Sequence, residues 1–185
     1  MRKRPRRRWL LSIAGALCLL MLGLLVTRSL FPLDYVDSLR EACATQDLDP
    51  AVVAALIRWE SRFEADALSP KGAIGLMQIM PDTGAWIAEN LGMAVLHPDD
   101  LWDAEINLSL GTWYLRSLID RFGTLNLALA AYNAGPSRVE TWQRDSTSPY
   151  LETEAYIRRI RLSIPLYRIV LVMPEFYRAL PAVRP

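Results

Sequence analysis

One stretch of 18 consecutive residues without a charged side chain, from Trp9 to Val26, limits the folds open to this chain more than any other feature. An apolar segment of this length can span a bilayer as a helix. Six basic residues stand directly before it, within residues 2–8. Basic residues on this flank keep their end in the cytoplasm. The sequence therefore predicts a single-pass anchor, with the rest of the chain exported.

A cleaved signal peptide has the same order of charge, and this alternative stays open. Its apolar core usually has about 7–15 residues and ends in a small-x-small cleavage site. The core here is longer, and residues 25–32 offer no clean site of that kind. We therefore favour a retained anchor over secretion after cleavage. Lipoprotein processing at Cys18 is disfavoured, because Leu17 is larger than the residue expected before such a cysteine.

The charge balance reverses after the apolar segment. All 20 acidic residues follow position 28, where 14 basic residues remain, so residues 29–185 carry a formal net charge of −6. Nucleic-acid binding requires a clustered basic surface. The sequence therefore predicts no nucleic-acid partner. The basic N-terminal run is better explained as a topology signal with affinity for anionic lipid headgroups.

Cysteine and histidine usage excludes several chemistries. Cys43 is the only cysteine after the apolar segment, and His97 is the only histidine. A disulfide within the exported part, a cysteine metal site and a His-dependent triad all need more of these residues. We predict no metal and no cofactor. We interpret Cys43 as a small buried residue of a helix.

Helical periodicity dominates the rest of the chain. The expected helices are 34–45, 50–63, 82–91, 103–122, 125–133, 136–142 and 153–162, the last with a continuation kinked at Pro165. Repeated alternation typical of strands is missing, although residues 72–79 can form a brief extended turn. The predicted fold is mainly α, preceded by a transmembrane helix.

The chain divides into three expected regions. Residues 1–28 form the cytoplasmic basic end and the anchor, and residues 29–165 form one domain large enough to bury a core. Residues 166–185 form a C-terminal tail with Pro174, Pro181 and Pro185. We expect residues 171–185 to run over the surface without regular structure.

A glutamate at the end of an apolar helix is the first candidate for chemistry. Asp49 can cap the helix that starts at Pro50, and Glu60 follows Leu56 by four residues at the edge of the apolar stripe. The negative end of the helix dipole and the apolar neighbours both raise the pKa of such a carboxyl group. A general acid working near neutral pH needs that property. The alternative is a glutamate that simply borders the core.

Four short blocks give this candidate a context. They are Glu60-Ser61, the Gly-rich run at residues 72–81, the run Ala-Ala-Tyr-Asn-Ala-Gly at residues 130–135, and Glu152-Thr153 with Tyr156. In this order they resemble the catalytic domain of the soluble-type lytic transglycosylases, the lysozyme-like enzymes that cleave bacterial peptidoglycan. The resemblance covers residues 34–162 and implies a lysozyme-like helical fold for the exported domain.

The resemblance also implies a reaction. Most glycosidases use two carboxylates. In lytic transglycosylases one Glu protonates the leaving oxygen of the MurNAc-GlcNAc β-1,4 bond. The resulting carboxylate then takes the proton from the C6 hydroxyl of the muramic acid. That hydroxyl replaces water, the product carries a 1,6-anhydroMurNAc end, and the 2-acetamido group of the substrate stabilises the cation. On this resemblance Glu60 is the single acid and base.

Three further residues near Glu60 are implied to bind substrate. Ser61 would hydrogen-bond the glycan or its acetamido group, although a serine at a helix end often only caps the helix. Met77 and Gln78 would line the floor of the cleft, with Gln78 hydrogen-bonding to sugar groups. Met77 taken alone reads as a core residue.

The remaining implied binding residues lie in the second half of the chain. Tyr132 can bury its ring while its hydroxyl points into the cleft, and Asn133, otherwise a helix C-terminal residue before Gly135, would bind substrate. Glu152 and Tyr156 share one helix face. Glu152 would bind substrate or orient the site, but it is equally well placed to stabilise a helix start. The family pattern is irregular just before Glu152, which leaves its role most open.

These implications predict a membrane-anchored periplasmic enzyme of the bacterial inner membrane, with peptidoglycan strands as substrate. Two other readings stay open, a lysozyme-like hydrolase of the same bond and an inactive peptidoglycan-binding scaffold. A short connection between the anchor and a domain beginning near Asp34 would confine the cleft to a shell next to the membrane. We therefore expect action on new glycan near the cell-wall synthesis machinery. Endo or exo cleavage and the recruiting complex stay undetermined.

Overall fold

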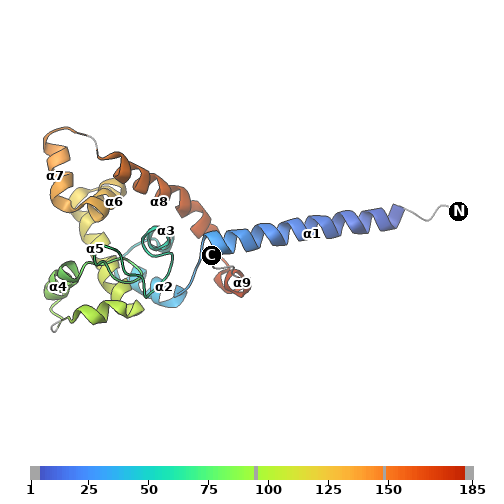
Figure 1. The fold of residues 1–185 in the computed structure, drawn as a ribbon, viewed down its shortest axis with the longest axis horizontal. Helices are drawn as coiled ribbons and strands as arrows, with labels where there is room; N and C mark the ends of the chain where they lie inside the picture. The colour runs from blue at the N-terminus through green and yellow to red at the C-terminus, as the bar shows by residue number, and fades with distance from the viewer. Residues whose placement is uncertain (1–4, 94–95, 148, 182–185) are drawn as a thin grey trace.

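A single long helix projects from one end of a helical domain (Figure 1). The computed structural model describes residues 5–93, 96–147 and 149–181. The projecting helix is α1 (Pro5–Leu30). The domain contains α2 (Val36–Thr45), α3 (Pro50–Glu60), α4 (Pro81–Asn90), the 3-10 helix η1 (Pro98–Trp102), α5 (Ala104–Phe122), α6 (Leu125–Ala134), α7 (Pro136–Arg144), α8 (Leu151–Val170) and α9 (Pro174–Ala179).

The expected apolar helix is present and extends four residues beyond Val26, to Leu30. Its segment Leu11–Leu30 has a mean hydropathy of 2.0, and only 6% of the apolar window is buried against the rest of the protein. By length and composition this helix can cross a membrane. A signal sequence near an N-terminus has the same properties.

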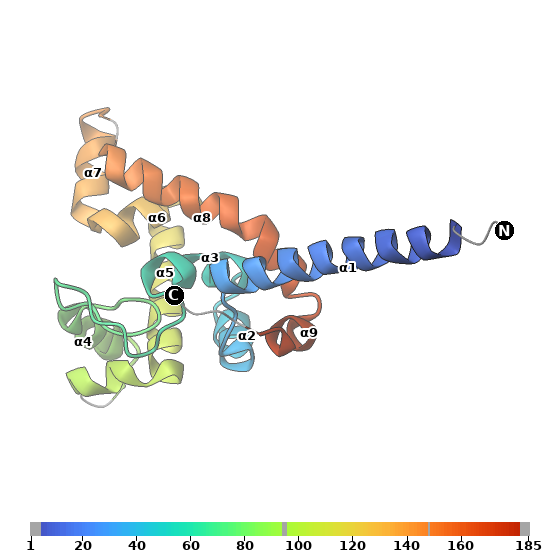
Figure 2. The same cartoon turned by 45° about the vertical axis from the view of Figure 1, so that its right-hand side comes forward.

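Helix α3 forms the centre of the core. Residues 51–57 are all buried, which an apolar helix achieves only when other elements surround it. It packs along α8 and against α2, while α5 packs against both α6 and α2. Figure 2 shows α8 passing over this central region from α7 toward α1. The side chain of Asp49 accepts a hydrogen bond from Ala51 N at 2.9 Å, which confirms the predicted cap.

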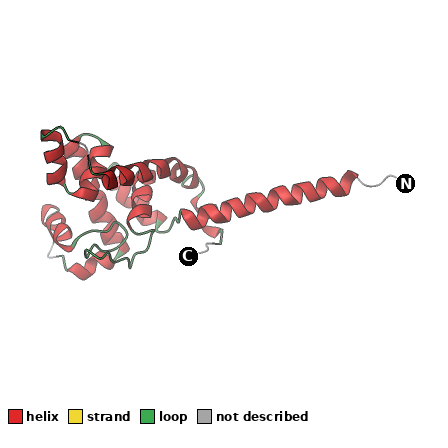
Figure 3. Cartoon of the chain, turned by 45° about the horizontal axis from the view of Figure 1, so that its top comes forward, coloured by secondary structure: helices red, strands yellow, loops and turns green. Residues whose placement is uncertain are grey.

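The mainly α prediction is confirmed. The described residues form helices and loops without a regular strand (Figure 3). Ile74 makes isolated bridges to Leu68 and Ile79, so the brief extended turn is present as well. Cys43 is fully buried on α2, as expected. His97 is exposed at the start of η1.

One expected helix end is clearly wrong. The helix expected over 50–63 ends at Glu60, because Arg62 and Phe63 adopt positive φ angles of 56° and 65°. The N–H groups of Ser61 and Arg62 both donate to Ile57 O, at 2.9 and 3.1 Å, and close the helix. At the other end of the domain, α8 begins at residue 151, two residues earlier than expected, and the expected continuation through Pro165 runs to residue 170.

The expectation of an irregular tail at 171–185 is also wrong for its first part. Residues 174–179 form α9, with Pro174 at the first helical position, where proline starts a helix rather than breaking it. Tyr177 is 4% exposed. Its hydroxyl group donates to the carbonyl oxygens of Thr27 and Phe31, at 2.9 and 2.8 Å. These hydrogen bonds attach α9 to the end of α1. Residues 182–185 lie outside the described residues.

The connection between α1 and the domain is short and packed rather than extended. Leu33 is fully buried in the core, and the ring of Phe31 contacts the ring of Tyr167 edge-on. The Tyr167 hydroxyl donates to Pro32 O at 2.9 Å. Arg28, 6% exposed, forms an ion pair with Asp34 at 3.2 Å. The domain therefore holds the residues that were expected to form a linker.

Candidate active site

Glu60 is the last residue of α3, and the closed helix end directs the chain away from it. Trp59, the residue before it, donates from Nε1 to Ser163 Oγ on α8 at 3.0 Å, which fixes the last turn of α3 against α8. From α8 the Tyr156 hydroxyl group donates to Oε1 of Glu60. Within the described part of the chain Oε2 has no hydrogen-bond partner, so this oxygen is free to carry a proton.

The surroundings of Glu60 favour its protonated form. Burial raises the pKa of this carboxyl group from 4.5 to about 7, and the hydrogen bond from Tyr156 partly opposes the rise because it stabilises the carboxylate. The side chain nevertheless keeps part of its surface accessible. Burial and the nearby Glu60 raise the pKa values of Tyr156 and Tyr132 well above the usual range, so both hydroxyls stay protonated donors.

The Gly-rich run at residues 72–81 forms a tight turn beside Glu60. Asn107 of α5 is fully buried and holds this turn from the inside. Its Oδ1 accepts from Met77 N at 2.8 Å, and its Nδ2 donates to Ile74 O and Leu101 O, each at 2.9 Å. A Cβ atom on Gly75 would lie 2.4 Å from Nδ2 of Asn107. Glycine is therefore required where the turn approaches α5.

Three predicted binding residues in or next to this turn have internal partners. The Ser61 hydroxyl is buried and donates to Leu76 O at 2.7 Å. The amide nitrogen of Gln78 donates to Ala67 O at 3.1 Å and Gly75 O at 2.9 Å. Their remaining oxygen lone pairs can accept hydrogen bonds from a ligand. The Met77 side chain is fully buried against Gly111 of α5, so it packs the turn onto α5.

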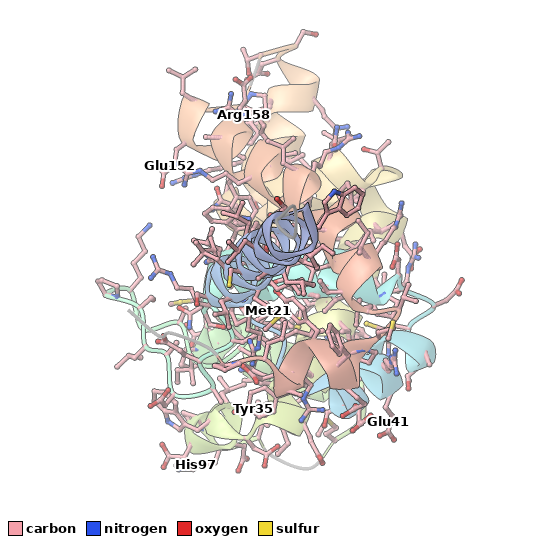
Figure 4. All side chains as sticks on the ribbon, turned by 90° about the vertical axis from the view of Figure 1, so that its right-hand side faces the viewer. Met21, Tyr35, Glu41, His97, Glu152 and Arg158 are labelled. Carbon is pink, nitrogen blue, oxygen red and sulfur yellow. The ribbon has the colours of Figure 1, made fainter. Side chains whose placement is uncertain are left out.

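The predicted residues of α6 and α8 meet the same turn from the other side. The Tyr132 hydroxyl donates to Met77 O at 2.8 Å. Asn133 is exposed near the end of α6, and its Oδ1 accepts from Thr153 Oγ1 at 3.2 Å. Tyr156 reaches Glu60, whereas Glu152, one turn earlier, is exposed and projects from the edge of the domain (Figure 4). The structure thus brings the predicted residues together except for Glu152.

Sequence reasoning missed an aromatic cluster and its support. The rings of Tyr114 and Tyr132 lie 5.4 Å apart, and Trp86 lies 6.3 Å from Tyr114. A pocket of about 500 Å³ opens beside this cluster, lined by Asp82, Thr83, Trp86, Tyr114, Ser117, Leu118, Arg121, Pro136 and Ser137. Glu60 is not part of its lining. The contact between the two tyrosines connects the pocket to the carboxyl site.

Asn107 and Gly111 were not singled out in the sequence either. A Cβ atom on Gly111 would lie 2.4 Å from Sδ of Met77. The sequence signal that could have found them is a polar residue and a glycine one turn apart on the helix. Both residue types lower helix stability, so their presence there indicates a role in packing or hydrogen bonding. Among the described residues, no three His, Cys, Asp or Glu side chains are grouped so that they could hold a metal ion.

Comparison with known proteins identifies the same region of the chain. Residues 37–152 match the profile of the transglycosylase SLT domain. The soluble lytic murein transglycosylase of Escherichia coli strain K12 is 33% identical over 151 residues, which cover 75% of this chain and 23% of the relative. The membrane-bound lytic murein transglycosylase F of Shewanella frigidimarina is 30% identical over 127 residues, with 65% and 25% covered. The chain thus spans about a quarter of these relatives.

A solved structure agrees with the sequence matches. The lytic transglycosylase Slt of Pseudomonas aeruginosa, determined as an inactive Glu-to-Gln mutant, has a TM-score of 0.71 and 32% identity, over 77% of this chain and 25% of that chain. The predicted resemblance is therefore confirmed at the level of sequence and of fold. Because the matched region covers more than half of its length, the chain belongs to the transglycosylase SLT domain family.

Proposed function

We propose that this protein is a membrane-anchored lytic transglycosylase that cleaves the MurNAc-GlcNAc β-1,4 bond of peptidoglycan with Glu60 as its single acid and base. The observation that carries the proposal is the position of Glu60. Its carboxyl group lies at a closed helix end, burial raises its pKa to about 7, and Tyr156 binds only one of its oxygens. Membership of the SLT family supports the choice of substrate and of reaction.

Each step moves one proton between Glu60 and the substrate. The protonated Oε2 donates to the glycosidic oxygen as the bond from C1 breaks, and the carboxylate that remains is stabilised by the Tyr156 hydroxyl. The carboxylate then accepts the proton of the C6 hydroxyl while that oxygen bonds to C1. This step closes the 1,6-anhydro ring and restores the acid. A carboxyl group with a pKa near 7 suits both directions, since neither form is strongly favoured near neutral pH.

Contacts at the end of α1 support retention of the anchor. Leu24 packs against the core, and Arg28 lies between Asp34 and the ring of Tyr177, with its guanidinium carbon 5.7 Å from the ring centroid. Tyr177 binds the carbonyl oxygen of Thr27. Cleavage before residue 29 would remove these contacts. The relative named membrane-bound from Shewanella frigidimarina is consistent with an anchored member of this family.

Substitution of Glu60 by Gln tests the proposal. The change is isosteric and removes only the transferable proton, so activity should fall by roughly 10³-fold or more while the protein still folds and binds glycan. The matched control is Glu154→Gln, an exposed glutamate of α8. Digestion of purified peptidoglycan followed by product masses measures the outcome.

The same assay separates the competing functions. Products with 1,6-anhydro ends support the proposal, and products with reducing ends identify a hydrolase. A protein that binds peptidoglycan without cleaving it is a scaffold. More than a tenth of wild-type activity in Glu60→Gln would contradict the assignment of this residue.

A further inference from the structure

An apolar surface surrounds the base of α1 on the side of α9. Val172 and Met173, in the turn between α8 and α9, are 78% and 61% exposed, and Phe176 of α9 is 55% exposed. Ile169, at the end of α8, is 69% exposed. We call Ile169, Val172, Met173 and Phe176 the α9 patch. Large apolar side chains gathered in one short segment indicate a contact surface rather than ordinary solvent exposure.

The position of the α9 patch along α1 follows from hydrogen bonds. Tyr177, next to Phe176, binds the carbonyl oxygens of Thr27 and Phe31, which lie one and five residues after Val26, the last residue of the charge-free run. In Figures 1 and 2 α9 and the turn before it lie beside the domain-side end of α1. Figure 4, which looks along α1 toward the domain, shows α9 immediately below α1.

This position corresponds to the surface of a bilayer. The charge-free run Trp9–Val26 is long enough to cross a hydrocarbon core about 30 Å thick, and Arg28 follows it, so the core ends between Val26 and Arg28. The α9 patch is therefore held at the boundary between acyl chains and headgroups. Apolar side chains at this depth leave water and enter the outer part of the acyl region.

We propose that the α9 patch is a second membrane contact, inserted into the outer-leaflet interface next to α1. The inference rests on the proposed anchoring, because it needs α1 in the bilayer. Arg168 forms an ion pair with Asp49 at 2.8 Å, and Arg178 lies 3.7 Å from Glu175, so these charges beside the patch are paired. Burial of apolar surface rather than charge would hold the patch in the bilayer.

Two contacts on one rigid body have a consequence for the active site. A single helix allows the domain to tilt and to rotate about the helix axis, whereas a second contact away from that axis restricts both movements. The end of α3 is bound to the end of α1 as well. Arg58, two residues before Glu60, donates from Nε to Leu30 O. The α9 patch therefore sets the direction in which the carboxyl site faces relative to the membrane.

Fluorescence quenching by lipids tests the contact in the full-length protein. The native Cys18 is exposed on α1, whereas Cys43 is fully buried with its thiol pKa raised to about 12, so an environment-sensitive thiol dye labels Cys18 selectively. In two further variants Cys18→Ala removes this labelling site. One of them carries Phe176→Cys and the other Met93→Cys as the new labelling site. Met93 is a matched apolar control that follows α4 and is 44% exposed. Helix α4 lies at the far end of the domain from α1 (Figure 1).

The three proteins are labelled in detergent, checked for unchanged melting temperature, and reconstituted into vesicles of phosphatidylethanolamine and phosphatidylglycerol. The vesicles contain lipids with a spin label either near the headgroup or deep in the acyl chain. We expect deep quenching at position 18, and shallow quenching at position 176, because interfacial groups insert only about 5–10 Å. Position 93 should stay unquenched.

The outcomes separate the inference from the proposed function. Quenching at position 18 without quenching at position 176 overturns the second contact and leaves the anchor intact. A dye at 176 that is shielded from aqueous iodide but not quenched by lipid also overturns it, because a protein then covers the patch. An unquenched dye at position 18 overturns the anchor and this inference together, while catalysis by Glu60 is tested separately by product masses.

Discussion

Two opposing influences act on the carboxyl group of Glu60. Burial raises its pKa and the hydrogen bond from Tyr156 lowers it, with a result of about 7. The balance keeps the acid populated near neutral pH without making the carboxylate inaccessible as a base. Tyr156 therefore acts as a positioning and tuning residue, although the sequence indicated only a substrate contact for it.

The first consequence at this scale concerns the pH dependence of activity. Because the proposed reaction starts from protonated Glu60, kcat/KM of the wild type should fall as the pH rises through about 7. Tyr156→Phe removes a donor that stabilises the carboxylate, so the pKa of Glu60 rises. The fall in kcat/KM should then occur at higher pH. Tyr150→Phe, at an exposed tyrosine before α8, is the control. If kcat/KM of Tyr156→Phe falls at the same pH as that of the wild type, the hydrogen bond does not tune the pKa of Glu60.

The same pKa predicts a pH-dependent difference in stability. The folded pKa of Glu60, about 7, lies above its ordinary value of 4.5, so the folded state loses stability relative to the unfolded state as the pH rises from 4.5 to 7. The loss reaches about 3 kcal/mol above pH 7, where it is complete. Glu60→Gln cannot ionise and avoids it.

Chemical denaturation of the full chain in detergent measures this difference. Glu60→Gln should be the more stable protein at pH 8, and its advantage should shrink toward zero as the pH approaches 4.5. Glu154→Gln, at an exposed position, should differ little from wild type at either pH. Equal stability of Glu60→Gln and wild type at pH 8 would mean that the carboxyl group is well solvated.

At the scale of elements, the site depends on how α5 holds the turn at residues 72–80. Asn107 satisfies one N–H group and two carbonyl groups of buried backbone with a single side chain. Tyr132 of α6 binds Met77 O of the same turn. The turn is thereby fixed between two helices, and Glu60 faces a rigid floor rather than a mobile loop.

Removal of Asn107 should therefore affect both stability and turnover. Asn107→Ala leaves Met77 N and Leu101 O unpaired and opens a cavity, while Ile74 O keeps its bond from Ile79 N, so the free energy of unfolding should fall by about 3 kcal/mol. The displaced turn should also lower kcat. Asn126→Ala, an exposed asparagine of α6, should change stability by less than about 0.5 kcal/mol. Urea denaturation and turnover on purified peptidoglycan measure the two effects, and normal kcat in a destabilised Asn107→Ala would confine Asn107 to folding.

At the scale of the whole molecule, the anchor and the domain behave as one body. Tyr177, Tyr167 and Arg58 each bind a backbone carbonyl group between residues 27 and 32. The connection between α1 and the domain is short and packed, since residues 27–30 are helical and Leu33 is buried. The cleft is thus confined close to the bilayer if α1 spans it.

A long flexible Gly/Ser insertion after Arg28 should release this confinement. We expect digestion in intact cells to shift from newly made glycan toward bulk glycan, because the domain can then reach further from the membrane. Activity on purified peptidoglycan in solution should not change. Pulse-labelled cell walls distinguish the two pools. Recovery of the native protein from the soluble periplasm, starting after position 28, would instead identify residues 1–28 as a signal peptide.

Local patterns sufficed to predict much of this protein. The apolar run from Trp9, the cap at Asp49 and the helical spacing of α5 depend on neighbours in sequence, and the structure confirms them. The candidate acid was also visible, because its burial follows from the apolar stripe of its own helix. A raised pKa needs only apolar surroundings, which a sequence reveals.

Tertiary contacts decided the rest, because they join residues far apart in the chain. Tyr156 meets Glu60 across 96 positions and Asn107 meets Met77 across 30, which no local pattern encodes. The segment from Pro174 has proline and little apolar periodicity, so it reads as an irregular tail. In the structure it contains the helix α9, and Tyr177 of this helix binds the carbonyl oxygen of Thr27, 150 residues earlier. The sequence thus determined the helices and the acid, whereas packing determined the acid's partner and the attachment of the domain to its anchor.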